Sequence, residues 1–538
     1  MLLKIIMNIK TEIHKIENNR YLTIMPFLLL HILLFSLHLY LGIINFRIGL
    51  VDTAIYQTSL WQAGQFINPQ FYFYPNDPHT FTNLHFMPIA FVYGILYKVF
   101  NNLIITSILY VTVSSVTTWF IYLTSFNILK NNLRATFFAI LHNLYFLLPV
   151  HHFYPLDYFA QLFIVLGLYY FSKEEYRLSF LYFFISFLHK EYFSVSISLF
   201  CLGQFLLFIK SKPIIFSKEI NKNDKSKLLF LVPTFFFGIL WFYFSFVIVM
   251  DGLNENNFVN KFVFDDAWGS AGPINNLKAV ISIVFKEIIL PKNILFILYL
   301  IIPYCFISLI GFEYLISIIP MLLILILVDG DSFPAQPINR FTVWLSPFIT
   351  ISAVIGYKRI IKYLKSNKYL INIFKTSILV SFFYFSISSL HLQIYHLKNR
   401  LLWNLIHEEY NNDLKYLINT VPEKSSVTSE DYLLPFLSER KKIYTLNQIA
   451  EKKPDYILRD FIGYSYSDFI AHLSNVGLFN YLFKNEAFKK NSILNGKEKD
   501  LYKKQLPFRS FNSYRVVYRF SSFPFKILFF LKASFLNK

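Results

Sequence analysis

The sequence is short of cysteine, glycine and charge. It contains 2 Cys and 16 Gly in 538 residues, and only 15% of its residues are charged. Cys201 and Cys305 both lie inside apolar runs, so neither a disulfide scaffold nor a thiolate metal site is expected. No phosphate-binding glycine loop, dinucleotide fingerprint or HExxH motif occurs. These absences exclude the common soluble nucleotide-binding and zinc-dependent enzymes.

The sequence is rich in apolar and aromatic residues instead. Hydrophobic residues make up 55% of the chain and aromatic residues 20%, with 63 Phe and 37 Tyr. The mean hydropathy is +0.45. Apolar runs of about 20 residues, the length that a helix needs to cross a bilayer, recur through the first three quarters. The sequence therefore predicts an all-α polytopic integral membrane protein.

The first apolar run, from about 21 to 46, follows four basic residues and lacks a small-residue cleavage site, which favours an uncleaved helix entering from the cytoplasm. A further apolar piece at 85–100 is opened by His85 and Pro88, and we interpret it as interfacial or re-entrant. The other candidate spans are 103–129, 135–150, 158–171, 178–189, 192–209, 228–250, 294–312, 314–328, 341–356 and 371–393.

The basic residues orient these spans. If 85–100 does not span, the basic clusters at 130–134, 173–177, 210–227 and 358–368 all fall in cytoplasmic loops, as the positive-inside rule predicts. This topology has about eleven spans. In a rival topology 85–100 spans and 178–209 forms one helix, which would place Lys190 and Glu191 in mid-bilayer at a cost of at least ~2.5 kcal/mol per charge. A count of eleven or twelve stays open.

The favoured topology divides the chain into a cytoplasmic N-terminus at 1–20, a membrane domain at 21–393 with its first outer loop at 47–102, and an extracytoplasmic domain at 394–538. The net charge of +19 is then shared between cytoplasmic loops and the outer tail, and nucleic acid is not needed to explain it.

The tail alternates short strands with a helix. Strands are expected at Val427, at 443–446 and at "DYILRD", with a helix beginning near Glu430 and capped by Ser429. This pattern predicts a small soluble α/β domain. The last stretch, "FPFKILFFLKASFLNK", suits either a membrane surface or packing on that domain.

The candidate functional residues all fall on the outer side in this topology. Asp52 follows the first span, where an unpaired carboxylate is costly unless it has a partner or a task. It could act as a general base, hold a divalent cation, or only cap the short helix that begins one residue later. Asp157 likewise precedes an apolar helix and has the same capping alternative.

Lys190 and Glu191 interrupt an apolar stretch together. They could neutralise each other at a tight outer turn, or Lys190 and Arg340 could bind a phosphate group. His85 and His152 are supporting candidates for metal binding or proton transfer.

Five segments, in this order and spacing, resemble a known family. They are "VDTAIYQTSLWQAGQF", "NLHFMPIAFVYGILYKVF", "HHFYPLDYFAQLFIVLGLYYF", "LHKEYFSVS" and "VPEKSSVTSEDYLLPFLSERKKIYTL". The chain resembles the uncharacterised membrane proteins of domain-of-unknown-function family 2079, which are in turn similar to C-type (GT-C) glycosyltransferases.

The resemblance implies a GT-C-like fold and transfer of a sugar from a polyprenyl-phosphate donor on the outer face of a bacterial cytoplasmic membrane, in the cell envelope. It matches Asp52 to the acidic residue of the first outer loop and Asp157 to a second outer-loop acid. Some members of the superfamily need a divalent cation such as Mg or Mn, at Asp52 and Asp157 if anywhere. The acceptor stays unspecified. Two alternatives remain: a transporter or lipid flippase, and a non-catalytic membrane scaffold whose outer domain binds a partner.

Overall fold

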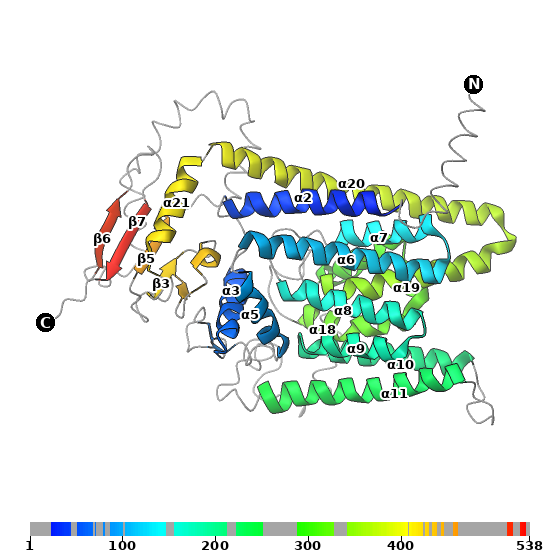
Figure 1. Ribbon diagram of the computed structural model, residues 1–538. Coiled ribbons are helices and arrows are strands. Elements are labelled where there is room, and N and C mark those ends of the chain that lie inside the picture. The colour runs from blue at the N-terminus through cyan, green and yellow to red at the C-terminus, as the bar shows by residue number, and fades with distance from the viewer. Residues whose placement is uncertain are drawn as a thin grey trace, which may run out of the picture.

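The structure is a computed structural model dominated by long helices that lie side by side in one bundle (Figure 1). It describes residues 23–44, 51–67, 70–71, 79–80, 87–100, 103–146, 155–211, 222–250, 288–327, 342–406, 408–422, 425–429, 433–437, 439, 443–445, 456–460, 514–519 and 528–533. The bundle helices are α2 (Met25–Ile44), α6 (Leu103–Leu129), α7 (Asn132–Phe146), α8 (Pro155–Ser172), α9 (Tyr176–Phe187), α10 (Glu191–Ser211), α11 (Lys222–Tyr243), α19 (Thr342–Tyr363) and α20 (Lys368–Ile406).

Helices suit this apolar sequence because hydrocarbon offers no water to backbone N–H and C=O groups, which a helix pairs internally. The small hydroxyl residues buried on α6 follow the same rule. Thr117, Thr118 and Thr124 each donate to the carbonyl oxygen four residues earlier, at 2.8–3.0 Å. Their hydroxyls are thus satisfied within α6, while their small size lets neighbouring helices approach.

Five of the described helices are long and apolar enough to cross a membrane, or six if one bent pair counts as a single span. The expected count of about eleven is therefore not confirmed. Two of the expected spans are short, because α7 has 15 residues and α9 has 12. These shorter helices nevertheless lie in the same bundle as the long ones (Figure 1). The chain has the helical architecture of a polytopic integral membrane protein.

The region around Lys190 decides between the two topologies. A turn separates α9, which ends at Phe187, from α10, which begins at Glu191. One helix over 178–209, as the rival requires, is therefore wrong. The piece at 85–100 forms α5 (Ile89–Val99), whose 11 residues are too few to span.

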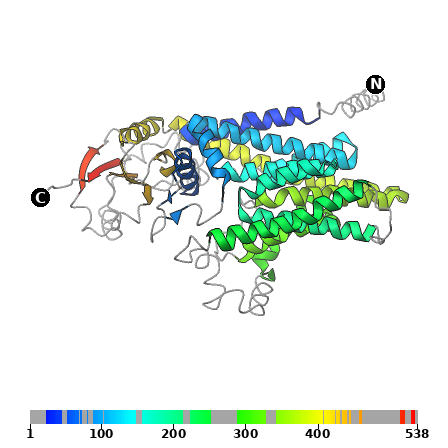
Figure 2. The same ribbon diagram turned by 60° about the horizontal axis from the view of Figure 1, so that its bottom comes forward.

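Helix α5 lies against α3 (Val51–Gly64) across one end of the bundle (Figures 1 and 2). The two helices touch at Gly64 and Gly94, where a Cβ on either glycine would collide with the backbone of the other helix. A two-stranded ribbon of β1 (Gln70–Phe71) and β2 (His79–Thr80) accompanies them.

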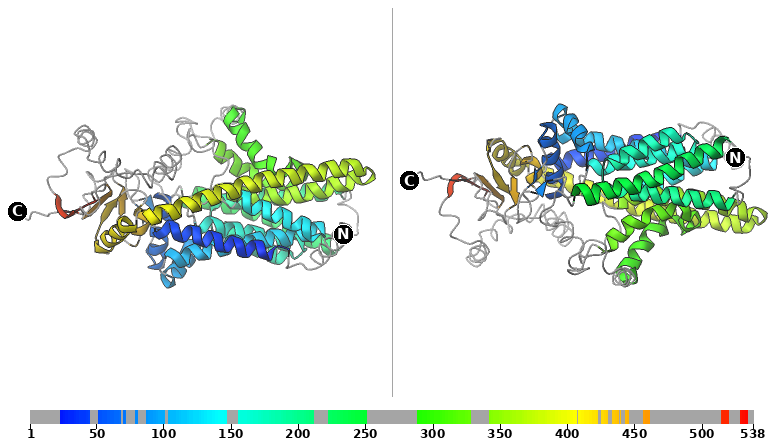
Figure 3. Two further views of the ribbon diagram at one scale, coloured as in Figure 1. Left: turned by 90° about the horizontal axis from the view of Figure 1, so that it is seen from above. Right: turned by 90° about the horizontal axis from the view of Figure 1, so that it is seen from below.

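The expected spans 294–312 and 314–328 form one segment bent by 90°. The break falls at Cys305 and Phe306, which both adopt the left-handed backbone conformation. Figure 3 shows the segment leaving the side of the bundle. It comprises α16 (Pro291–Ile301), η3 (Ile302–Tyr304), η4 (Ile307–Gly311), α17 (Phe312–Leu315), η5 (Ile316–Ile318) and α18 (Ile319–Leu327).

Close backbone contact and one ion pair hold the bent segment against α19. A Cβ on Gly356 would collide with the Ile307 carbonyl, so only glycine permits this approach. Arg359 donates from Nη2 to Glu313 Oε1 at 2.6 Å and from Nη1 to Glu313 Oε2 at 3.0 Å. Its Nη1 also donates to the Ile310 carbonyl at 2.7 Å.

Beyond α3 and α5 lies a five-stranded sheet with the order β4-β3-β5-β7-β6 (Figure 1). The three expected strands are present, and β3 pairs in parallel with both β4 and β5. The described part of the expected helix near 430 is a 3₁₀ turn, η7 (Leu434–Leu437). The strands are β3 (Val427–Ser429), β4 (Ile443–Thr445), β5 (Tyr456–Asp460), β6 (Tyr514–Arg519) and β7 (Leu528–Ala533), and α21 (Glu408–Thr420) precedes them.

The apolar C-terminal stretch supplies β7, which pairs with β5 and β6 and so belongs to the sheet. The domain boundary at 394 stays a prediction, because α20 runs across it without a break from Lys368 to Ile406.

The ion pair predicts an asymmetric effect of neutralising its two members. Glu313 is 1% exposed, whereas the Arg359 side chain is 37% exposed and can turn to water. Arg359→Gln should therefore lower the free energy of unfolding by about 2–3 kcal/mol, and Glu313→Gln by less, because only the former strands a buried charge. Thermal unfolding in detergent measures both, with Lys362→Gln on the same helix as the control. Equal losses for the two variants would contradict this account.

Candidate functional site

The turn between α9 and α10 places a cation among aromatic rings. Lys190 is 2% exposed, and its Nζ lies 4.5 Å from the centre of the Trp344 ring. The rings of Tyr56 and Tyr192 are each 5.7 Å from the same Nζ. Because the three rings come from α19, α3 and α10, this ammonium group connects three elements that are far apart in sequence. We call these four residues the Lys190 cage.

The beginnings of α8, α10 and α19 lie close to one another at the cage. Gln161 on α8 donates to the Val343 carbonyl on α19 at 3.0 Å, and the neighbouring Trp344 covers Lys190 directly before α10. Tyr110 on α6 contacts the ring of Phe159 on α8, with centroids 6.3 Å apart. Helix α9 ends at Phe187, beside the same turn, so helix ends of both polarities lie next to the cage. The N-terminus of α10 is the helix end that favours an anion there.

Glu191 is the first residue of α10 and is 4% exposed. A carboxylate in the first turn interacts favourably with the helix dipole. The adjacent Lys190 and Glu191 thus lie together at the buried turn, as the sequence indicated. Both proposed roles remain compatible with this arrangement: mutual neutralisation and anion binding by Lys190.

His189 joins this turn to α5. Its Nδ1 lies 2.9 Å from the Ile185 carbonyl oxygen, and its Nε2 lies 2.7 Å from the Tyr93 hydroxyl. Since a carbonyl only accepts, Nδ1 carries the hydrogen and Nε2 accepts from Tyr93. The Ile89 N–H also donates to the Leu188 carbonyl at 3.2 Å. Burial lowers the pKa of His189 to about 3, so the imidazole is neutral at physiological pH.

Helix α3 connects the cage to the sheet domain. Its polar side chains Gln57, Thr58, Ser59 and Gln62 are buried beside Tyr56. Helix α3 also contacts η7 of the sheet domain. From the neighbouring α5, the Tyr97 hydroxyl donates to Glu439 Oε1 at 3.4 Å. Helices α3 and α5 therefore lie between the end of the bundle and the sheet.

The structure brings only part of the expected site together. Asp52 and Asp157 lie in the first turns of α3 and α8, at the end of the bundle that holds the cage. Asp52 is four residues before Tyr56, one helical turn away on the same face of α3. The side chains of both aspartates, and His85, His152 and Arg340 altogether, lie outside the described residues.

Sequence reasoning missed Gln161, a buried polar residue at this end. Its Nε2 donates to Ser346 Oγ at 2.8 Å, and His142 Nε2 lies 3.1 Å from the same oxygen. His142, a histidine within an expected span, is thus packed and hydrogen-bonded, as the sequence favours. This network holds the first turns of α19, which carry Trp344. The available signal for Gln161 was a Gln inside an apolar run, but its partner Ser346 is 185 residues away in sequence.

Metal binding at the site stays a prediction. Among the described residues, no three His, Cys, Asp or Glu side chains gather as a metal ion would need. The side chains of Asp52 and Asp157, the donor set predicted for a cation, lie outside the described residues.

His189 predicts a pH dependence of stability. Because its buried site accepts the neutral imidazole, the unfolded chain binds a proton below about pH 6.5 that the folded chain does not, and stability falls as pH falls from 6.5 toward 3. The loss from this residue at pH 5 is about 2 kcal/mol. The melting temperature of the wild type in detergent should therefore drop more steeply between pH 7.5 and pH 5 than that of His189→Gln. Parallel curves for the two proteins would show that His189 does not titrate in this way.

Comparison with known proteins identifies the family of this chain. No curated protein matches the chain. A family described as "Predicted membrane protein (DUF2079)" matches residues 43–502, a range that takes in α3, α5, the bundle helices after α2 and much of the C-terminal tail. Since that range is most of the sequence, the chain belongs to the DUF2079 family of predicted membrane proteins.

Proposed function

We propose that the protein is a membrane glycosyltransferase that moves a sugar from a polyprenyl-phosphate donor to an acceptor at the α3–α5 end of the bundle. The observation that carries this proposal is the buried ammonium of Lys190 among three aromatic rings directly before α10. Burial of an ionisable side chain is costly, which makes Lys190 a candidate functional residue. Lys190 and the N-terminus of α10 attract the same kind of ligand, a phosphate group.

Asp52 is the proposed base of the reaction. Its support is the helical spacing, because Asp52 comes one turn before Tyr56, the α3 residue whose ring lies near Lys190. A carboxylate there takes the proton of the acceptor hydroxyl as that oxygen attacks the anomeric carbon, and polyprenyl phosphate leaves. Lys190 stabilises the charge on the leaving phosphate, assisted by Arg340, which precedes α19 by two residues. Asp157, in the first turn of α8, assists Asp52 directly or through a divalent cation.

The rings that surround Lys190 set a condition on this chemistry. At 2% exposure the ammonium is covered by Tyr56, Tyr192 and Trp344. Donor binding must therefore displace at least one ring, and α3 is the element that can carry Tyr56 away. Closure of α3 over the bound donor would then exclude water from the reacting atoms.

A second candidate function, lipid flipping or transport, is favoured by one observation. The segment Asn293–Leu323 contains a 90° bend between two helical parts, and broken helices are frequent in secondary transporters. Such a protein would move the lipid-linked sugar without cleaving it.

Transfer from reconstituted protein separates these functions. In proteoliposomes supplied with polyprenyl-phosphate sugars, we expect the wild type to release free polyprenyl phosphate. Asp52→Asn should reduce the rate at least ~100-fold, as loss of a general base does. Lys190→Met should also abolish release, whereas Lys98→Met on the exposed part of α5 should not. Unchanged release from both Asp52→Asn and Asp157→Asn would refute the assigned chemistry, and movement of intact donor would favour the flippase.

We also propose that the protein resides in a bacterial cytoplasmic membrane with its N-terminus inside and the sheet domain outside. The end of the bundle opposite the sheet carries the basic residues Lys130, Arg134, Lys173, Arg177 and Lys362, which the positive-inside rule assigns to the cytoplasm.

Cysteine labelling tests this orientation. Cys201 is buried and Cys305 is half-buried, so both are replaced by Ser before single cysteines are introduced. Lys415→Cys on α21 should react with a membrane-impermeant maleimide in intact cells, because α21 adjoins the sheet. Lys362→Cys should react only after the membrane is opened. Reaction of both residues from the same side would overturn the orientation.

A further inference from the structure

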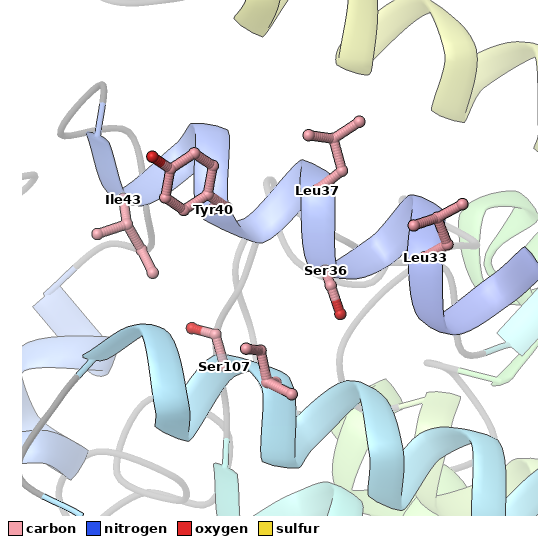
Figure 4. A pocket seen from close by; sticks show the side chains of 7 residues that line it. Leu33, Ser36, Leu37, Tyr40, Ile43 and Ser107 are labelled. Atoms are coloured by element: carbon pink, nitrogen blue, oxygen red, sulfur yellow. The ribbon is translucent and has the colours of Figure 1, made fainter. Parts of the chain in front are cut away.

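A groove opens between α2 and α6 near the end of the bundle that holds the Lys190 cage (Figure 4). Its volume is about 300 Å³, at the small end of ligand pockets. Ser36 on α2 and Ser107 on α6 lie on the two sides of the gap, where larger side chains would close it. Its lining consists of Leu33, Ser36, Leu37, Tyr40, Ile43, Ser107 and Ile108.

The same two helices are joined firmly farther from this end. His31 Nδ1 on α2 lies 2.8 Å from Ser115 Oγ on α6, and both side chains are buried. The groove is thus a local feature of the outer parts of α2 and α6.

The surroundings of the groove identify the chemistry of its occupant. Both α2 and α6 are long and apolar enough to cross a membrane. The rim residues Leu33, Tyr40 and Ile108 are exposed, at 66%, 44% and 45%. A protein surface of this kind faces the hydrocarbon of the bilayer, where the available ligands are lipid chains.

The inner wall of the groove leads to the candidate site. Behind it, Tyr110 is buried with Leu39 and Val111, and Phe159 packs against this cluster. The Phe159 ring also lies 4.8 Å from the ring of Tyr93, whose hydroxyl donates to His189 next to Lys190. The rings of Tyr110, Phe159 and Tyr93 thus form a series of contacts from the wall of the groove to His189, next to the cage.

We infer that this groove seats the hydrocarbon chain of the polyprenyl-phosphate donor, with the phosphate directed toward Lys190 and the N-terminus of α10. This inference rests on the proposed function for the identity of the lipid. The groove holds the chain at the lipid-facing side of α2, so the donor enters laterally from the bilayer and its phosphate meets the Lys190 end of the bundle.

Photo-crosslinking tests the groove. Purified full-length protein in nanodiscs is exposed to a polyprenyl phosphate that carries a diazirine on its chain, and labelled peptides are identified by mass spectrometry. We expect labelling concentrated in α2 and α6, and loss of most of it in Ser36→Phe, whose ring fills the groove. Ser377→Phe, the same change at an exposed position on α20, is the matched control and should label like the wild type. Leu37→Trp repeats the test if Ser36→Phe does not give a monodisperse protein.

Competition distinguishes the donor from bulk lipid. Unlabelled polyprenyl phosphate should suppress the cross-links, and phosphatidylglycerol at the same concentration should not. Equal suppression by both lipids, or labelling spread evenly over all exposed helices, would overturn the inference. Failure of the proposed function gives a different pattern, namely competition specific for polyprenyl phosphate but no sugar transfer.

Discussion

The burial of one lysine ammonium among three aromatic rings is the constraint on which the α3–α5 end of the bundle depends. Lys190 directly precedes α10, and Trp344 near the start of α19 lies over its ammonium group. A buried cation is unfavourable without compensation. The faces of three rings supply part of that compensation. Since the rings come from α3, α10 and α19, the same interaction fixes where α3 meets the bundle.

The packing of α3 on the Lys190 cage explains how the sheet domain is connected to the helix bundle. Helix α3 meets the cage through Tyr56 and the sheet through η7, while α5 meets the turn through Tyr93 and the sheet through Tyr97. The close backbone contact at Gly64 and Gly94 packs α3 tightly against α5. The two helices therefore form one packed connection between the sheet domain and the rings over Lys190.

The lengths of the apolar runs and the charges between them predicted most of the helices, but not which helices are long enough to span a membrane. The expected span 103–129 matches α6, and the expected turn at Lys190 separates α9 from α10, because runs of apolar residues and their charged interruptions are local signals. The break at Cys305 and Phe306 was not predicted, since neither residue is glycine or proline and the bend depends on close contact with Gly356 and Arg359 on α19. The Lys190 cage was found only in part for the same reason. Its lysine interrupts an apolar run, but nothing near Tyr56 or Trp344 in sequence indicates that they cover it.

A comparison with the Glu313–Arg359 pair supports a functional role for Lys190. Glu313 and Arg359 form a bidentate pair that also binds the Ile310 carbonyl, so holding the bent segment on α19 accounts for both charges. The Lys190 ammonium is covered by three ring faces, which keep a cation–π interaction while they remove much of its hydration. A charge held in this way directly before α10 is explained if it is used on a phosphate group that the N-terminus of α10 also attracts.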